Sequence, residues 1–220
     1  MNRLYEAQKS PIQNLIDGYQ AFGNGRSFLN KPQDDSYQAR FCGLIDLTNI
    51  SRVGFRGAEA AEYLTAQGFL LPEAPNTLVT QSDGSVVARL SATEYMLLGG
   101  VADLGERLAQ LENSWVMSEQ LNYLLPRQDS HALFQITGAY LAPIMAKLCA
   151  VDLSQETFVI GQVVQSSVAR VNAIIMNVSD EQTNKFNILC DRTMALYLWD
   201  VLVDAMQEFD GEVLGINALI

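Results

Sequence analysis

The sequence is poor in the residues that build metal centres and nucleophilic active sites. It has one histidine, His131, and three widely spaced cysteines, Cys42, Cys149 and Cys190, with no Cys-x-x-Cys pair. This content excludes the usual zinc-site patterns and is typical of reduced thiols in a cytoplasmic protein. A Ser-His-Asp or Cys-His enzyme would need His131 as its base. We expect a structural role for His131 instead, at the start of a strand.

Basic residues and long apolar runs are also scarce. The 14 Lys and Arg residues are scattered against 25 Asp and Glu, which gives a net charge of −11 and argues against a nucleic-acid partner. Apolar runs stay below the ~18 residues of a membrane span, and the first residues lack the apolar segment of a signal peptide. We therefore expect a cytoplasmic protein. Its low charged fraction, 18%, fits either a surface buried by a partner or an apolar monomer.

Residues 1–41 are polar and rich in turn-forming residues, so we expect an N-terminal arm rather than a folded domain. Ile12, Leu15, Ile16 and Tyr19 recur at i, i+3, i+4 and i+7, which predicts one short amphipathic helix. Such an arm either wraps a partner or is disordered, and the pattern leaves both alternatives open.

A strand–glycine–helix–strands–helix pattern occurs twice after the arm. We expect one unit over residues 42–125 and a second over 126–220, with residues 121–129 as the connection. Several strands follow one another without helices between them, which favours an α+β fold with antiparallel or mixed sheets. The expected elements of the first unit are a strand through 53–55, a helix to Gln67, strands flanking Asp83-Gly84, a strand at 95–98 and a helix over 102–111. Those of the second are a strand at 133–136, a helix with Leu141, Ile144, Met145 and Leu148 on one face, strands at 162–169, 171–178 and 186–189, and a helix over 192–209.

Four segments carry a resemblance to a known family. Asp46–Leu64 (DLTNISRVGFRGAEAAEYL) resembles the opening motif of the folate-dependent aminomethyltransferase (glycine-cleavage T-protein)-like superfamily. The further segments are Val87–Leu98 (VARLSATEYMLL), the run from Ile136-Thr137-Gly138 through Leu148–Leu153 to Phe158–Gly161, and Asp191–Asp200 (DRTMALYLWD). These are similar to the sarcosine oxidase gamma subunit family within that superfamily, in the same order along residues 42–212.

The resemblance implies a T-protein-like folate-binding scaffold and a gamma-type, non-catalytic subunit of a heterotetrameric sarcosine oxidase-like complex that oxidises secondary amines. Larger flavoprotein subunits of alpha and beta type would be its partners. Tetrahydrofolate, FAD, FMN and NAD are implied for the whole complex and none for this chain. The alternatives are a stand-alone folate-binding protein and a divergent aminomethyltransferase.

The expected catalytic acid of the superfamily is missing. In active members a paired Asp follows a glycine such as Gly84 on the next strand, where this chain has Val87 and Ala88. Asp83 is the nearest carboxylate, and because it precedes Gly84 we expect it to form the turn. We therefore assign no catalytic, cofactor-binding or metal-binding residue, and we expect no activity of the chain alone.

Three further motif residues have a structural interpretation. Arg89 and Glu94 could pair with each other or cap a strand end, and we favour such a role over ligand binding. Cys149 lies upstream of Gly161-Gln162 without the Cys-Tyr of the folate-dependent iron-sulfur assembly proteins, so we expect it to be a packed apolar residue.

The closing helix is the best candidate for a partner surface. One apolar face suits the sheet, while Met194, Tyr197 and Val201 form a second apolar stripe. A helix that is apolar on more than one face tends to be buried on both. The second stripe is therefore either core of the same chain or a possible interface with another subunit.

Overall fold

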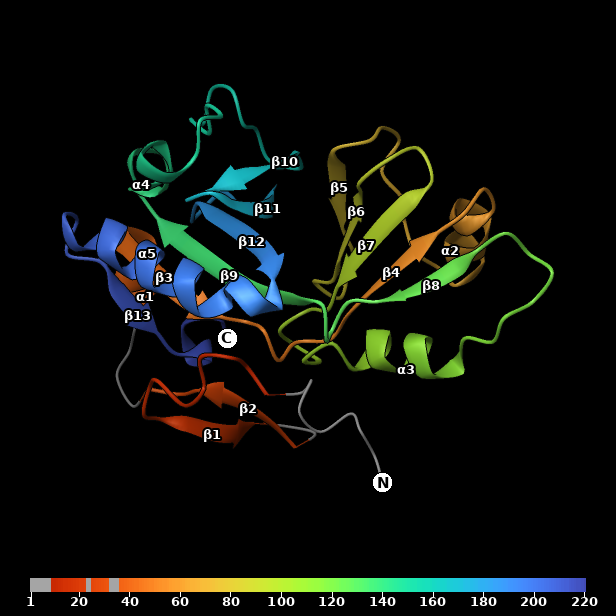
Figure 1. Ribbon diagram of the computed structural model, residues 1–220, viewed down its shortest axis with the longest axis horizontal. Helices are drawn as coiled ribbons and strands as arrows, with labels where there is room; N and C mark the ends of the chain where they lie inside the picture. Colours follow the sequence, from red (N-terminus) through yellow and green to blue (C-terminus); the bar gives the residue numbers. More distant parts are fainter. Residues whose placement is uncertain (1–8, 23–24, 32–35) are drawn as a thin grey trace. The chain divides into compact units, whose positions relative to one another are not determined.

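The described residues of the computed structural model are 9–22, 25–31 and 36–220, and they form two compact units. Figure 1 shows the elements of each unit. One unit consists of residues 50–128 and 161–163, and the other contains the remaining described residues. This division differs from the expected one at residues 42 and 126, because the strand at 42–46 joins the sheet of the second half. Residues 1–8, 23–24 and 32–35 of the expected arm lie outside the described residues.

The N-terminal segment contains a β-hairpin where a helix was expected. Strands β1 (Tyr19–Phe22) and β2 (Arg26–Leu29) pair antiparallel, and residues 11–18 are turns. The predicted helix is therefore wrong. Gly18 has φ +108° just before β1, a backbone conformation outside the right-handed helical region. Ile12 is fully buried while Leu15 is 59% exposed, so the expected apolar face does not exist.

The described part of this segment is attached to its own unit by long-range hydrogen bonds. The Tyr19 hydroxyl donates to Asp46 Oδ2 at 2.5 Å, and Asn49 Nδ2 donates to the Ser27 carbonyl at 2.6 Å. Helix α1 (Ser36–Phe41) then leads directly into the first strand of the larger sheet. Burial and the neighbouring Asp46 carboxylate raise the pKa of Tyr19, which keeps its hydroxyl a donor.

The smaller unit is a five-stranded antiparallel sheet with order β5-β6-β7-β4-β8. Its elements are β4 (Arg52–Arg56), α2 (Ala60–Ala66), β5 (Thr77–Thr80), β6 (Val86–Arg89), β7 (Glu94–Leu98), α3 (Glu106–Ser114) and β8 (Tyr123–Pro126). Strand β8 lies where a connection was expected, and it pairs with β4. Helix α3 begins later than predicted because Leu104 and Gly105 have φ of 52° and 76°.

The larger unit is a six-stranded mixed sheet with order β10-β11-β12-β9-β3-β13, in which β13 runs parallel to β3. Its elements are β3 (Cys42–Asp46), β9 (His131–Gly138), α4 (Leu141–Leu148), β10 (Val163–Val168), β11 (Val171–Asn177), β12 (Lys185–Asp191), the 3-10 helix η2 (Arg192–Met194), α5 (Ala195–Gln207), β13 (Glu212–Leu214) and the 3-10 helix η3 (Ile216–Leu219). The expected α+β class with antiparallel and mixed sheets is confirmed.

The two units repeat the same order of elements, as the sequence pattern predicts. In each, a central strand (β4 or β9) leads through a glycine into a helix (α2 or α4), then three consecutive antiparallel strands and a second helix. In the smaller sheet the central strand β4 lies between β7 and β8, and in the larger sheet the central strand β9 lies between β12 and β3. Both β8 and β3 run antiparallel to the central strand.

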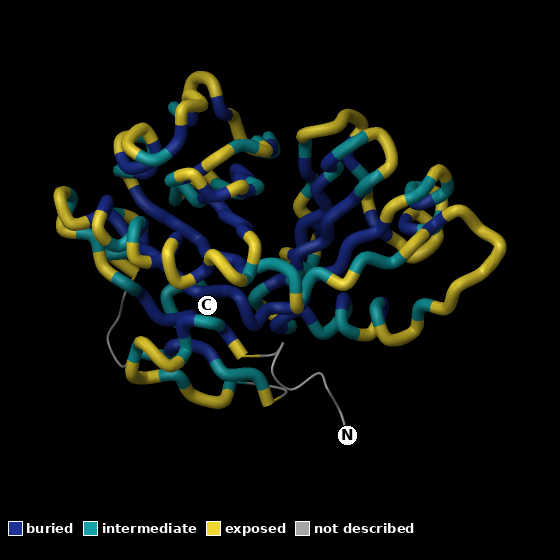
Figure 2. Tube along the Cα trace, viewed as in Figure 1, coloured by how far each residue is buried: buried dark blue, intermediate teal, exposed yellow. Residues whose placement is uncertain are grey.

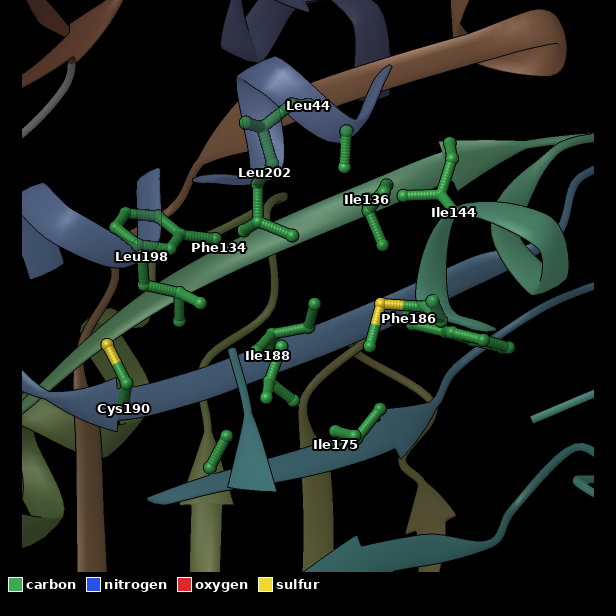
Figure 3. Close-up of a cluster of buried hydrophobic side chains, with 14 of the residues drawn as sticks. Leu44, Phe134, Ile136, Ile144, Ile175, Phe186, Ile188, Cys190, Leu198 and Leu202 are labelled. Atoms are coloured by element: carbon green, nitrogen blue, oxygen red, sulfur yellow. The ribbon is translucent and has the colours of Figure 1, made fainter. Parts of the chain in front are cut away.

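The core of the larger unit lies between the sheet and its helices (Figure 3). Alternate residues of β9 and β12, among them Phe134 and Ile188, are fully buried against Leu198 and Leu202 of α5. The ring of Trp199 meets Phe134 edge-on at 5.1 Å between centroids. Each fully buried side chain of this size contributes about 1.5–3 kcal/mol of transfer free energy, so α5 is held mainly by this face.

Burial is not confined to the helix-covered faces (Figure 2). On the other face of the larger sheet, Gln135 and Asn187 are buried and joined by a 2.8 Å side-chain hydrogen bond between adjacent strands. Each helix in the described part of the chain is too short or too polar to cross a membrane.

Candidate functional site

The position of the expected catalytic acid lies within β6, in the middle of a buried sheet. Val87 and Ala88 are both fully buried. Val87 packs in the core of the smaller unit, and Ala88 lies opposite Leu78 and Met96 on the neighbouring strands. Proton transfer at a folate amine needs a carboxylate within reach. The residues at this position therefore do not fit the folate-linked chemistry of the superfamily's active members.

Asp83, the nearest carboxylate, forms hydrogen bonds within its own turn and with α3. Its Oδ1 accepts from Ser85 N at 2.9 Å and from Ser85 Oγ at 2.6 Å, and its Oδ2 accepts from Arg107 at 2.6 Å. Burial raises the pKa of Asp83, but the hydrogen bonds from Ser85 and Arg107 outweigh burial and lower the pKa to about 2. The guanidinium of Arg107 also stacks on the Phe69 ring, 4.0 Å from its centroid. This geometry orders a turn and leaves Asp83 a poor proton carrier at neutral pH.

Arg89 and Glu94 do not pair with each other. Arg89 donates to the carbonyl oxygens of Glu73 at 2.6 Å and Ala92 at 2.9 Å, on either side of its strand. Glu94 accepts from Arg127 at 2.6 Å, which ties β7 to the chain just after β8. Both residues therefore hold loops and strand ends.

The single histidine lines a polar groove at one end of the larger sheet. A cavity of about 410 Å³ is lined by His131, Gln165, Ser166, Ser167, Asn172, Ala173, Ile174 and Leu189. The Ser130 hydroxyl lies 2.8 Å from His131 Nδ1. Among the described residues that line this cavity, Ser166 and Ser167 carry hydroxyls but none carries a carboxylate or a thiol, so the lining lacks the acid of a Ser-His-Asp triad and the thiol of a Cys-His pair.

The three cysteines form no disulfide within the described part of the chain and are buried at separate places in the core of the larger unit. Burial raises the pKa of the Cys42 thiol to about 11, which keeps it protonated at neutral pH. Among the described residues, no group of three or more His, Cys, Asp or Glu side chains is placed to hold a metal ion.

The second stripe of α5 is partly exposed. Met194 is 38% and Tyr197 46% exposed, and Val201 is half-buried. The Tyr197 hydroxyl donates to the carbonyl of Ala169, at the tip of the β10–β11 hairpin, at 3.1 Å. Sequence reasoning missed Leu196, which is 44% exposed and lies on the outward side of α5, next to Tyr197 in sequence. A helical wheel of 195–207 places Leu196 away from the buried residues, so its exposure could have been predicted from the sequence.

Comparisons with known proteins agree on the scaffold. The family model described as the GCVT N-terminal domain matches residues 74–220. A chain of the heterotetrameric sarcosine oxidase from Corynebacterium sp. U-96, in complex with pyrrole 2-carboxylate, is similar with a TM-score of 0.64 and 20% identity. That match covers 92% of this chain and 96% of the other. A comparison with curated protein sequences gives no match.

The glycine cleavage system aminomethyltransferase T from Bartonella henselae has the same fold, with a TM-score of 0.69 and 17% identity over 96% of this chain. This chain spans only 60% of that longer protein. At these identities the two structures show the fold, and the family model covers most of the chain. The chain therefore belongs to the family of the GCVT N-terminal domain, within the T-protein-like superfamily that its sequence motifs predict.

Proposed function

We propose that this chain is a gamma-type, non-catalytic subunit of a heterotetrameric sarcosine oxidase-like complex in the cytoplasm. Its partners would be larger flavoprotein subunits of alpha and beta type. Tetrahydrofolate, FAD, FMN and NAD would be bound by those partners, and the amine oxidised by the complex would be a secondary amine. The role of this chain would be assembly of the complex.

One observation carries the proposal: the extent of the match to the sarcosine oxidase chain. The match covers 92% of this chain and 96% of that chain, with a TM-score of 0.64. A fold shared with a chain of a heterotetrameric sarcosine oxidase supports a subunit role for this chain.

The residues of the scaffold support the non-catalytic part of the proposal. Buried Val87 and Ala88 stand where a catalytic acid is expected, and Asp83 is engaged by Ser85 and Arg107. A divergent aminomethyltransferase would have to recruit a different acid.

A pull-down of the tagged chain from its native cells tests the proposal. The eluate is measured by absorbance between 350 and 500 nm, where ~450 nm is diagnostic of oxidised flavin, and by mass spectrometry. We expect co-purification of two large flavin-bearing subunits and turnover of a secondary amine by the eluate. A chain that elutes alone contradicts the proposal. A folate titration of the isolated chain would then separate a stand-alone binding protein from a chain without ligand.

A further inference from the structure

Helix α5 exposes apolar side chains on the face opposite its core contacts. Leu196 and Tyr197 are each more than a third exposed, as is Met194 at the end of η2, while Leu198 and Leu202 on the other face of α5 are fully buried. Leu196 and Tyr197 lie about 100° apart around the helix axis and flank the outward face of α5, and this pair forms the apolar patch. The helix is already held by its buried face, so the exposed patch is free to contact another molecule.

Two carboxylates follow the apolar patch on the same exposed face. Asp200 and Asp204 are exposed, stand four residues apart and form no ion pair or hydrogen bond within the described part of the chain. Like charges at this spacing repel, and Asp204 adds negative charge near the negative end of the helix dipole. Glu208, the next acid along this face, is instead paired with Lys147. Asp200 and Asp204 therefore weaken the isolated helix and remain available for an external cation.

A neighbouring hairpin contacts this surface through the Tyr197 hydroxyl. Ala169 and Arg170 form the two-residue tip between β10 and β11, with φ of 49° and 68°. Glycine or asparagine normally occupies such a turn, because side chains disfavour this backbone conformation. Two hydrogen bonds hold this tip in place. The Tyr197 hydroxyl donates to the Ala169 carbonyl, and Ala169 N donates to the Leu148 carbonyl at 2.7 Å. The tip and the apolar patch are thus held together.

We infer that the exposed face of α5, from Leu196 to Asp204, docks a segment of a larger partner subunit that presents a Lys or Arg beside an apolar side chain. The inference rests on the proposed function and adds the chemistry of the contact. The cation of the partner would lie against Asp200 and Asp204, and its apolar group against Leu196 and Tyr197. A second copy of this chain is a poor occupant, because its net charge of −11 opposes self-association.

Charge reversal tests the surface in the complex with the flavin-bearing subunits obtained from native cells. The variant Asp200→Lys/Asp204→Lys is compared with Glu119→Lys/Glu181→Lys, which changes the net charge equally at two exposed acids in loops away from α5. Because like charges across an interface oppose binding by several kcal/mol, we expect the α5 variant to raise Kd about 100-fold and the control to bind like wild type. Leu196→Gln should raise Kd about tenfold, through the apolar half of the contact.

The outcomes separate the two proposals. Wild type that binds the flavin-bearing subunits, with an α5 variant that binds equally well, overturns the docking surface and leaves the subunit role intact. Wild type that binds no flavoprotein overturns both. Self-association of the isolated chain in sedimentation velocity that Asp200→Lys/Asp204→Lys abolishes would assign the face to a second copy and overturn this inference. Circular dichroism and thermal unfolding verify that every variant is folded.

Discussion

Gly57 and Gly138 occupy the same position in the two repeated units, and each lies against a backbone carbonyl. A Cβ at Gly57 would lie 1.9 Å from the Leu121 oxygen, and one at Gly138 would lie 2.3 Å from the Phe41 oxygen. Leu121 and Phe41 precede the strands next to β4 and β9. Their carbonyls accept from Glu59 N at 3.0 Å and from Ala139 N at 2.9 Å. The repeat therefore preserves the close approach of a carbonyl to the glycine, while the N–H that donates to this carbonyl lies two residues after Gly57 and one residue after Gly138.

We predict that Gly57→Ala and Gly138→Ala each destabilise the protein by about 2–4 kcal/mol, because they combine backbone strain with a steric clash. Gly57 has φ 147° and Gly138 has φ 115°. The control is Gly68→Ala. Gly68 has φ 79° and open space around the position that a Cβ would take, so its replacement causes backbone strain without a clash and should cost only ~1 kcal/mol. Urea unfolding measures all three. Equal losses at Gly68 and Gly138 would show that the carbonyl contact is unimportant.

Asp83→Asn should remove a pH-dependent part of the stability. The pKa of Asp83 is lowered to about 2 in the folded protein, so the ionised carboxylate stabilises the fold at pH values above the ordinary carboxyl range. This contribution to the free energy of unfolding is lost as the pH falls from about 4 to 2. At pH 7 the free energy of unfolding of the wild type should exceed that of the variant by up to ~1 kcal/mol, because the ion pair of Asp83 with Arg107 is partly exposed. The difference should vanish near pH 2. Asp204→Asn is the control, and an unchanged difference from pH 7 to pH 2 would contradict the assignment.

Replacing the strained hairpin tip should stabilise the larger unit. Ala169→Asn with Arg170→Gly supplies the residues that favour positive φ, so we expect a gain of about 1 kcal/mol in unfolding free energy. The gain should persist when Tyr197→Phe removes the hydroxyl that holds the Ala169 carbonyl. Thermal unfolding of Tyr197→Phe, of the double variant at the tip and of all three substitutions together measures how far the effects of the tip and of the Tyr197 hydroxyl depend on each other. A loss of stability in the double variant would mean that the tip is not strained.

The Cys42 thiol should react only when its unit opens. Burial and a pKa raised to about 11 leave almost no accessible thiolate at pH 8. We expect Ellman's reagent to modify Cys42 at a rate that follows unfolding and rises with urea, and mass spectrometry of the modified peptide identifies the site. Introducing an exposed thiol by Glu181→Cys provides a control that reacts within seconds to minutes. Fast reaction of Cys42 in the native protein would contradict its burial.

The sequence predicted the parts of the fold that are coded locally. In the second half, the strand before Gly138, the helix face with Leu141 and Ile144, and the following strands were all expected. Alternating and 3.6-residue patterns determine such elements directly. The turn role of Asp83 followed from the Asp-Gly pair, and the structure adds Arg107 from α3, which no local pattern could indicate.

The failures have one local cause and two long-range causes. Residues 12–19 match a helical period, yet Gly18 and the pairing of β1 with β2 produce a hairpin. The short strand β8 is mostly exposed and ends in Pro126, so it resembled a connection. Of the two roles expected for Arg89 and Glu94, the ion pair between them does not form, and Glu94 instead pairs with Arg127, 33 residues away. The partners of β8 and of Glu94 lie far along the chain, where no local pattern indicates them.

The pairing of β3 with β9 and β13 has a consequence for synthesis of the chain on the ribosome. Strand β3 emerges early, but its partners follow only at residues 131–138 and 212–214. The smaller unit lies almost entirely between them in sequence and can close its own sheet first, through contacts of lower contact order. During this interval β3, with its apolar Leu44 and Ile45, has two unpaired edges. A nascent chain arrested before β9 should therefore depend on chaperones far more than one arrested before β3.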